Sequence, residues 1–209
     1  MERMGPREIE AKSMAIIARE LADRGIKTHE EEGPVLRRVI HATADFDFAH
    51  TLRFTPSAVE RGREALRGGV IVTDTNMALA GINKSALTRL DCRAVCFMGE
   101  EFIAQEAQRR GVTRARASMD YAVQEFPQGV YAVGNAPTAL LRLAEWIEGG
   151  GRPGLVIGVP VGFVNVVESK EKAWDVCQRH GVPAIIALGR KGGSGVAAAV
   201  CNALLYGTV

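Results

Sequence analysis

The sequence predicts a single α/β domain over residues 1–209, with three layers in which helices cover both faces of a mostly parallel, doubly wound, five-stranded sheet. Two observations lead to this fold class. Short apolar runs alternate with helix-length segments, and the runs are continuously apolar, as strands covered on both faces are. Strands that alternate with helices form βαβ units and therefore parallel sheets. The chain has 209 residues, of which 47% are hydrophobic, so it can bury a substantial core, and no linker divides it.

The elements follow one another in a regular order. Two helical stretches come first, at residues 9–21 and 35–45, and Pro34 stands at the start of the second. Five apolar runs, each too short for a helix, then predict the strands: 70–72, 94–97, 130–133, 155–157 and 184–188. Helix-length segments lie between and after these runs: 101–110, 138–148, 168–179 and 196–205. Gly111 and Gly181 follow two of these segments, where a C-terminal cap is expected.

Composition narrows the classes of function. The 26 basic and 24 acidic residues give a formal charge of +2 and are dispersed, so no global field favours nucleic acid. The N-terminus lacks the apolar core of a secretory signal, and no apolar run approaches the roughly 18 residues that span a bilayer. We therefore expect a soluble, cytoplasmic protein that binds neither nucleic acid nor membranes.

The cysteines and most of the histidines show no pattern of a metal site. Cys92, Cys96, Cys177 and Cys201 lack a zinc-ligand spacing, and reduced, mostly buried thiols are expected. The remaining histidines share no ligand spacing either, and the sequence has no nucleophile elbow for covalent catalysis. The sequence thus predicts no metal held by the protein.

The helix predicted at residues 35–45 carries the groups best suited to chemistry. Arg37, Arg38, His41 and Asp45 are spaced so that they converge on one face. An imidazole titrates near neutral pH and can give or take a proton, and guanidinium groups beside it suit an anionic ligand. A histidine on a helix is more often structural or merely exposed, so the spacing alone does not decide. Asp45 either raises the basicity of His41 or pairs with an arginine.

Ligands of a doubly wound fold bind beyond the carboxyl ends of the strands, where loops and helix N-termini present N–H groups. The segments 73–76 and 81–84 there offer hydroxyl, carboxylate and amide groups and the ammonium of Lys84. The segment 158–163 is apolar and suits a flat hydrophobic body. Together these segments combine groups that can bind an anion with an apolar wall. We expect Lys84 to bind substrate.

Two further loops follow predicted strands. Asn135 precedes Pro137 and is placed either to cap the next helix or to bind a ligand. The Gly-rich loop at 189–195 fits neither of the two common nucleotide-binding spacings. Its glycines either let strand and helix pack closely or hold a ligand anion.

Seven segments, in this order and over nearly the whole chain, match one known family: 38–41 (RVIH), 73–75 (TDT), 81–84 (GINK), 134–140 (GNAPTAL), 158–164 (GVPVGFV), 168–171 (ESKE) and 189–194 (GRKGGS). Through them the chain resembles the precorrin-8X and cobalt-precorrin-8 methylmutases of cobalamin biosynthesis. The run 41–47 (HATADFD), together with 81–84, is more similar to the anaerobic, cobalt-containing branch.

The resemblance implies an isomerase that moves a methyl group from C11 to C12 of the corrin ring and needs no external cofactor. The substrate would be cobalt-precorrin-8 or precorrin-8X, and the product cobyrinate, with cobalt, or hydrogenobyrinate. His41 aligns with the family's catalytic histidine, a proton donor and acceptor. Ser13 and Arg38 fall at substrate-binding positions, and Arg114 matches a further basic position. The family forms homodimers, with the ligand near the subunit interface.

The residues suit this chemistry independently of the resemblance. An apolar macrocycle ringed by carboxylates needs an apolar wall and several separate cationic, hydroxyl and N–H donors, which this chain supplies. A methyl shift within one molecule needs no redox carrier, in keeping with the missing nucleotide and metal motifs. Two alternatives remain at this stage. One is a carrier that binds a corrinoid intermediate without chemistry, and the other is a nucleotide-dependent α/β enzyme that uses the loop at 189–195.

Overall fold

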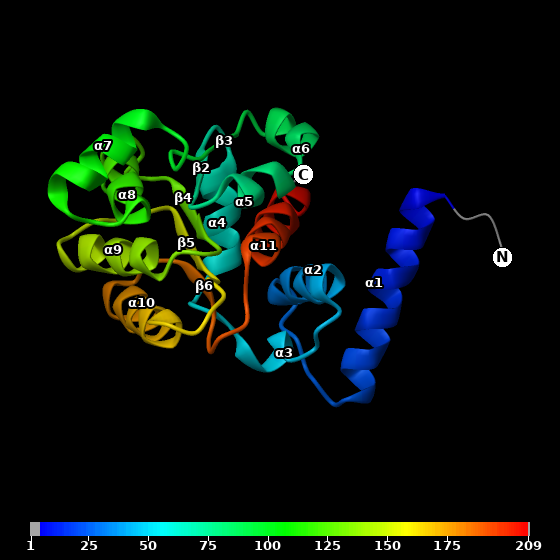
Figure 1. The fold of residues 1–209 in the computed structure, drawn as a ribbon. Coiled ribbons are helices and arrows are strands. Elements are labelled where there is room, and N and C mark those ends of the chain that lie inside the picture. The colour runs from blue at the N-terminus through cyan, green and yellow to red at the C-terminus, as the bar shows by residue number, and fades with distance from the viewer. Residues whose placement is uncertain (1–4, 209) are drawn as a thin grey trace.

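A computed structural model of the chain describes residues 5–208 and has, within them, one six-stranded sheet in the order β1-β6-β5-β4-β2-β3 (Figure 1). The strands are β1 (Leu52–Phe54), β2 (Val70–Thr73), β3 (Arg93–Val95), β4 (Val130–Val133), β5 (Leu155–Gly158) and β6 (Ala184–Ala187). All neighbouring pairs are parallel except β1 and β6. The α/β class and the mostly parallel sheet are confirmed.

The predicted number of strands was wrong, because the described residues form six strands and not five. The missed strand is β1, which has a single neighbour and lies antiparallel to it at the edge of the sheet. Its three residues include the exposed Arg53, so they do not form a continuous apolar run. Thr55 extends the pairing, since its Oγ1 accepts a hydrogen bond from the N–H of Ala184 at 2.8 Å.

Helices cover both faces of the sheet, which confirms the three layers (Figure 1). On the side of the first face lie α1 (Pro6–Asp23), α2 (Glu32–Thr43), α3 (Phe48–Thr51), α4 (Ala58–Leu66), α5 (Asn76–Gly81), α6 (Lys84–Arg89) and α11 (Ser194–Tyr206). The second is covered by α7 (Glu101–Arg110), α8 (Arg114–Glu125), α9 (Pro137–Glu148) and α10 (Val166–His180). None of the helices described is both long and apolar enough to cross a membrane.

Each face of the sheet has its own apolar core. In β4, Val130 and Ala132 belong to the core under α2, α4 and α11, whereas Tyr131 and Val133 belong to the core under α8, α9 and α10. Successive side chains of a strand point to opposite faces, so both sets are apolar only because both faces are covered. This explains the continuous apolar runs in the sequence.

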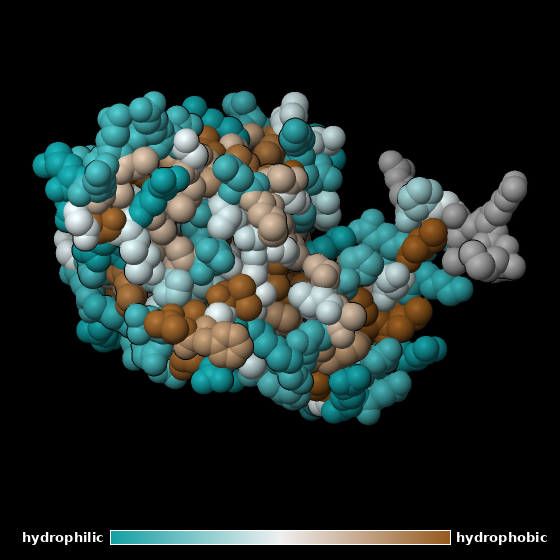
Figure 2. Space-filling model, viewed as in Figure 1, coloured by the Kyte–Doolittle hydropathy of each residue, from teal (hydrophilic) through white to brown (hydrophobic). Residues whose placement is uncertain are grey.

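The first helix, α1, stands at the rim of the molecule and packs mainly on α2 (Figure 1). Ile17 and Leu21 are buried in that contact, but Ile9 and Ile16 on the same helix are 50% and 40% exposed. The space-filling view shows apolar residues on the surface in the region of α1 (Figure 2). An apolar surface therefore remains open on this helix.

All four cysteines lie among the described residues and are free. Cys92, Cys177 and Cys201 are buried and Cys96 is half-buried, which confirms the expected burial. Burial raises the pKa of Cys92 to about 11 and those of Cys177 and Cys201 to about 12. These three thiols are accordingly unreactive parts of the core.

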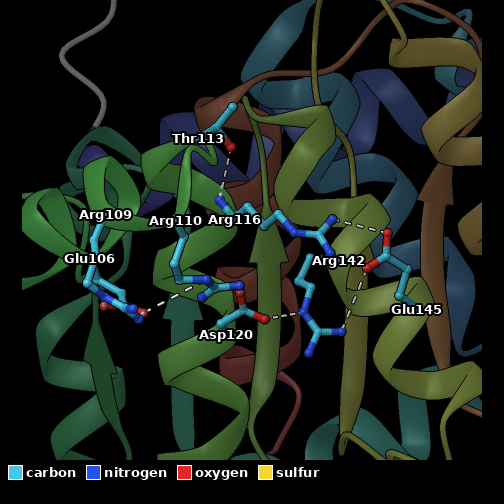
Figure 3. Close-up of polar contacts among 8 residues, drawn as sticks. All are labelled: Glu106, Arg109, Arg110, Thr113, Arg116, Asp120, Arg142 and Glu145. Carbon is cyan, nitrogen blue, oxygen red and sulfur yellow. Dashed lines mark hydrogen bonds and ion pairs between the residues drawn. The ribbon is translucent and has the colours of Figure 1, made fainter.

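A chain of ion pairs joins α7, α8 and α9 (Figure 3). Asp120 on α8 lies between Arg110 on α7, at 2.8 Å, and Arg142 on α9. Arg116 donates to both carboxylate oxygens of Glu145, at 3.1 and 2.6 Å. Burial raises the pKa of Asp120, but the two guanidinium groups outweigh it and hold the pKa below its ordinary value. The network fixes the three helices against one another.

Candidate functional site

His41 lies near the C-terminal end of α2 and lines a cavity of about 210 Å³ between α1 and α2. The apolar residues of α2 pack against α11, which leaves the imidazole exposed toward α1. Ser13 of α1 lines the same cavity, and its Oγ donates a hydrogen bond to the carbonyl of Ile9 at 2.9 Å. Two residues predicted for the site thus come together from separate helices.

Arg38 lies one turn before His41 on α2. Its Nη1 donates to Oε1 of Glu10 on α1 at 2.5 Å, and its guanidinium carbon lies 5.0 Å from the ring centre of Tyr206. The Arg38 side chain is only 21% exposed, so this ion pair is partly shielded from water. A substrate carboxylate could bind Arg38 in place of Glu10. No local pattern in the sequence indicated the roles of Glu10 and Tyr206, because both contacts depend on tertiary packing.

Lys84 is exposed at the start of α6 and lines a different cavity, of about 380 Å³, between α5 and α6. The residue before it, Asn83, caps this helix, since its Oδ1 accepts a hydrogen bond from the N–H of Ala86 at 2.9 Å. The Nδ2 of Asn83 also donates to the Tyr206 hydroxyl at 3.0 Å. Lys84 therefore lies outside the His41 cavity. Its neighbour Asn83 is connected to Arg38 because both contact Tyr206.

The loops after β2 and β4 are joined by a buried carboxylate. Asp74 accepts hydrogen bonds from the N–H groups of Gly134, Asn135 and Ala136 at 2.8, 2.8 and 2.7 Å. Burial raises the pKa of Asp74, and the three N–H donors oppose that shift. The Asn135 side chain is exposed, and Ala136 occupies the N-cap position of α9, so the alternative that Asn135 caps this helix was wrong.

Asp45 pairs with neither His41 nor an arginine. Its Oδ2 accepts a hydrogen bond from Nζ of Lys191 at 2.6 Å, and Asp47 accepts another from the same ammonium at 2.6 Å. The Lys191 ammonium lowers the pKa of Asp45, and the two carboxylates raise the pKa of Lys191. These contacts join the end of the His41 helix to the loop that follows β6.

The Gly-rich loop after β6 is closely packed. This agrees with the interpretation that its glycines let strand and helix approach each other. A Cβ on Gly192 would lie 2.1 Å from the carbonyl oxygen of Val159. Ser194, which begins α11, shares a 2.7 Å hydrogen bond with the hydroxyl of Thr75. Near this loop Val161 and Phe163 are 47% and 80% exposed, so part of the expected apolar wall is open.

Arg114 is exposed at the start of α8, on the second face of the sheet. Neither Arg114 nor Asn135 lines the His41 cavity. Among residues 5–208, no group of three or more His, Cys, Asp or Glu side chains is arranged to hold a metal ion. Within one chain, then, His41 and Ser13 line one cavity and Arg38 lies one helical turn away, whereas Lys84, Arg114 and Asn135 lie outside that cavity.

The family of this chain follows from its similarity to known proteins. A family model described as precorrin-8X methylmutase matches residues 8–207. The chain belongs to the precorrin-8X methylmutase family. The methylmutases are isomerases, so the chain is an isomerase of cobalamin biosynthesis, which confirms the reaction class that the resemblance implied.

Individual methylmutases agree over nearly their full length. The cobalt-precorrin-8 methylmutase of Salmonella typhimurium is 43% identical, over 96% of this chain and 95% of that protein. That of Priestia megaterium is 41% identical, over 95% of this chain and 87% of its own. The crystal structure of the precorrin-8X methylmutase of Thermus thermophilus has a TM-score of 0.85 at 38% identity, and 96% of each chain is covered. The methylmutase fold therefore extends over nearly the whole chain.

Proposed function

We propose that the chain moves a methyl group from C11 to C12 of cobalt-precorrin-8, giving cobyrinate, and that it does so in the cytoplasm. Relatives named cobalt-precorrin-8 methylmutase are 43% and 41% identical, and one named precorrin-8X methylmutase, from Pseudomonas aeruginosa, is 39% identical. These identities favour the cobalt-containing substrate by a small margin. Metal-free precorrin-8X, which would give hydrogenobyrinate, is the alternative substrate.

His41 acts in this proposal as the proton donor and acceptor. The observation that carries the proposal is the cavity that His41 shares with Ser13, with Arg38 one turn away. A proton given to a ring nitrogen draws electron density from the ring and eases the methyl shift. The proton returns to the imidazole afterwards, so atoms balance without a cofactor. A general acid of this kind contributes about 10²–10⁴-fold to the rate.

The other predicted residues hold the carboxylates of the macrocycle. Arg38, Lys84 and Arg114 supply positive charges at separate places, and Asn135 supplies an exposed amide. Separate donors suit a ligand whose carboxylates point outward around a wide ring. The exposed Phe163 near the carboxyl ends of the strands suits its apolar face.

We further propose that two copies of the chain form a homodimer with the site near the interface. The cavity at His41 has only about 210 Å³, whereas sites for drug-sized ligands have about 300–1,000 Å³, and a tetrapyrrole is larger than most drugs. The exposed apolar residues of α1, Ile9 and Ile16, lie beside this cavity or in its lining. A second chain that covers α1 would enlarge the site and bury these residues.

The test is a turnover assay of wild type, His41→Ala and His50→Ala with cobalt-precorrin-8 and with precorrin-8X, the products identified by mass and NMR. His50, exposed at the end of α3, is the control because it does not line the cavity. We expect His41→Ala to lose at least 10²-fold in turnover but to bind the corrinoid within a few-fold of wild type. His50→Ala keeps wild-type turnover.

Two outcomes would contradict the proposal. Tight binding of both compounds by wild type, without conversion of either, favours the carrier alternative. Undiminished turnover by His41→Ala leaves the isomerase but removes His41 as its proton donor. The ratio of turnover on the two compounds decides which substrate is used.

A further inference from the structure

Lys170 on α10 is a fully buried charge that the proposed chemistry does not use. Its side chain is 0% exposed, and its Nζ donates hydrogen bonds to the carbonyls of Gly189 and Lys191, both at 2.8 Å. Among the described residues no carboxylate forms an ion pair with it. Burial lowers the pKa of Lys170 to about 8. Burying an ammonium group costs folding free energy, so the presence of Lys170 at this position, bound to two loop carbonyls, needs an explanation.

The carbonyls that Lys170 binds belong to the loop after β6. Between them the carbonyl of Arg190 accepts a hydrogen bond from the N–H of Gly162 at 3.2 Å. Just beyond, the N–H of Gly193 donates to the carbonyl of Val159 at 2.8 Å. Three successive carbonyls of this loop thus accept hydrogen bonds, and Lys170 is the donor to two of them.

The loop held by Lys170 in turn holds the end of the His41 helix. Lys191 is one of the two residues whose carbonyls bind Lys170, and its own ammonium binds Asp45 and Asp47. Asp45 and Asp47 lie in the short connection between α2 and α3, and Oδ1 of Asp45 also accepts a hydrogen bond from the N–H of Asp47 at 3.0 Å. A continuous set of hydrogen bonds therefore runs from the buried ammonium, through the loop, to the segment after His41.

We propose that Lys170 is a positioning residue for the isomerase reaction: it fixes the loop at 189–193 so that Lys191 holds the end of α2 and, with it, the imidazole of His41. This inference rests on the proposed role of His41. Proton transfer requires close alignment of the reacting atoms, and a displacement of about 1 Å far from the chemistry can cost about 10²-fold in rate. Lys170 touches no reacting atom and acts only through the loop.

The substitution Lys170→Met keeps the length and the apolar stem of the side chain and removes the donors. Lys191→Met breaks the same connection at its exposed end, where a methionine disturbs no core. Lys172→Met is the control, because Lys172 lies on the same helix, is 42% exposed and pairs only with Glu148. Each variant, and the double variant of Lys170 and Lys191, is assayed for kcat, KM and melting temperature, with hydrogen exchange of residues 43–48 in the ligand-free protein.

We expect Lys170→Met and Lys191→Met each to lower kcat about tenfold or more, with KM within about twofold, and to speed exchange at residues 43–48. Because both act on one connection, the double variant has a kcat within about threefold of the poorer single variant. Lys172→Met leaves kcat and exchange unchanged. A purely structural lysine would lower the melting temperature without this pattern.

The inference is overturned if Lys170→Met melts earlier but keeps wild-type kcat and exchange, or if the two single effects on kcat multiply. Where Lys170→Met does not fold, Lys191→Met decides alone, and wild-type behaviour of that variant overturns the inference. Full turnover by His41→Ala would instead refute the proposed proton transfer. The exchange data test the connection to α2 independently, since no substrate is present.

Discussion

At the scale of single residues, buried charges organise the loops at the carboxyl ends of the strands. Lys170 binds the loop after β6, and Asp74 binds the loop after β4 through three N–H groups. Each places one charge among backbone groups of a segment far away in sequence. Hydrogen bonds to charged groups are stronger than neutral ones, so a single side chain can fix several residues of a loop.

We expect Asp74→Ala to lower the free energy of unfolding by about 3 kcal/mol, because it leaves the N–H groups of Gly134, Asn135 and Ala136 without their acceptor. Urea denaturation measures the change. Asp175→Ala is the control, since Asp175 is exposed on α10, and its effect stays within about 0.5 kcal/mol. Equal effects of the two substitutions would show that Asp74 does not hold the loop.

The candidate site could be predicted from the sequence only in part. His41 and Arg38 share one helix, so local spacing indicated their common face, and the family resemblance added Ser13. The ion-pair partners of the residues on this helix could not be predicted. Glu10 binds Arg38 and Lys191 binds Asp45 only because folding brings distant segments together, and an ion pair between them leaves no local pattern.

At the scale of elements, the helices on the second face depend on one another through charge as well as packing. Asp120 of α8 binds arginines from both neighbouring helices, and its side chain is only 13% exposed (Figure 3). Glu106 pairs mainly with the exposed Arg109 on the same helix, at 2.6 Å, and more distantly with Arg110, at 3.8 Å. The two carboxylates contribute differently, because exposed pairs are weakened by water and salt.

Asp120→Ala is expected to lower the free energy of unfolding by about 2 kcal/mol, since it leaves Arg110 and Arg142 without their shared partner in a partly buried place. Glu106→Ala has a much smaller effect on the free energy of unfolding, because its ion pairs are open to water and salt. Thermal and urea unfolding of both variants provide the comparison. A loss from Glu106→Ala as large as that from Asp120→Ala would assign the stabilisation to surface charge in general.

Most of the long elements were predictable, but the helices α4 and α8 and most of the short elements were not. Apolar patterns identified the strands after β1, including the half-buried β3, and the helices near residues 9–21, 101–110, 138–148, 168–179 and 196–205. α5 and α6, of six residues each, lie in a region that the sequence indicated as ligand-binding loops. Helices this short are stabilised by caps such as Thr75 and Asn83 and by packing on the body of the fold, more than by their own periodicity.

At the scale of the whole molecule, the residues proposed for the site are spread over both faces of the sheet in one chain. The cavity at His41 is small, and Arg114 lies on the opposite side of the sheet from α1 and α2. The apolar surface on α1 remains open to solvent. A second copy of the chain supplies what the first lacks if it covers α1, which is the arrangement we propose.

We expect light scattering coupled to gel filtration to give twice the chain mass for wild type at micromolar concentration. The double substitution Ile9→Asp and Ile16→Asp places charges on the exposed side of α1 and shifts the protein toward the single-chain mass. Phe102→Asp is the control, because Phe102 is exposed on α7, on the other face of the sheet. A monomeric wild type would refute the homodimer, and a double variant that stays dimeric would place the interface away from α1.

The short strand β1 also forms one edge of the sheet. An open edge strand offers unpaired N–H and carbonyl groups to other molecules and is a common starting point of aggregation. β1 closes one edge with only three residues, and the exposed charge of Arg53 lies at their centre. A strand this short and charged is a poor template for a foreign strand, so the folded sheet resists pairing with other molecules at this edge.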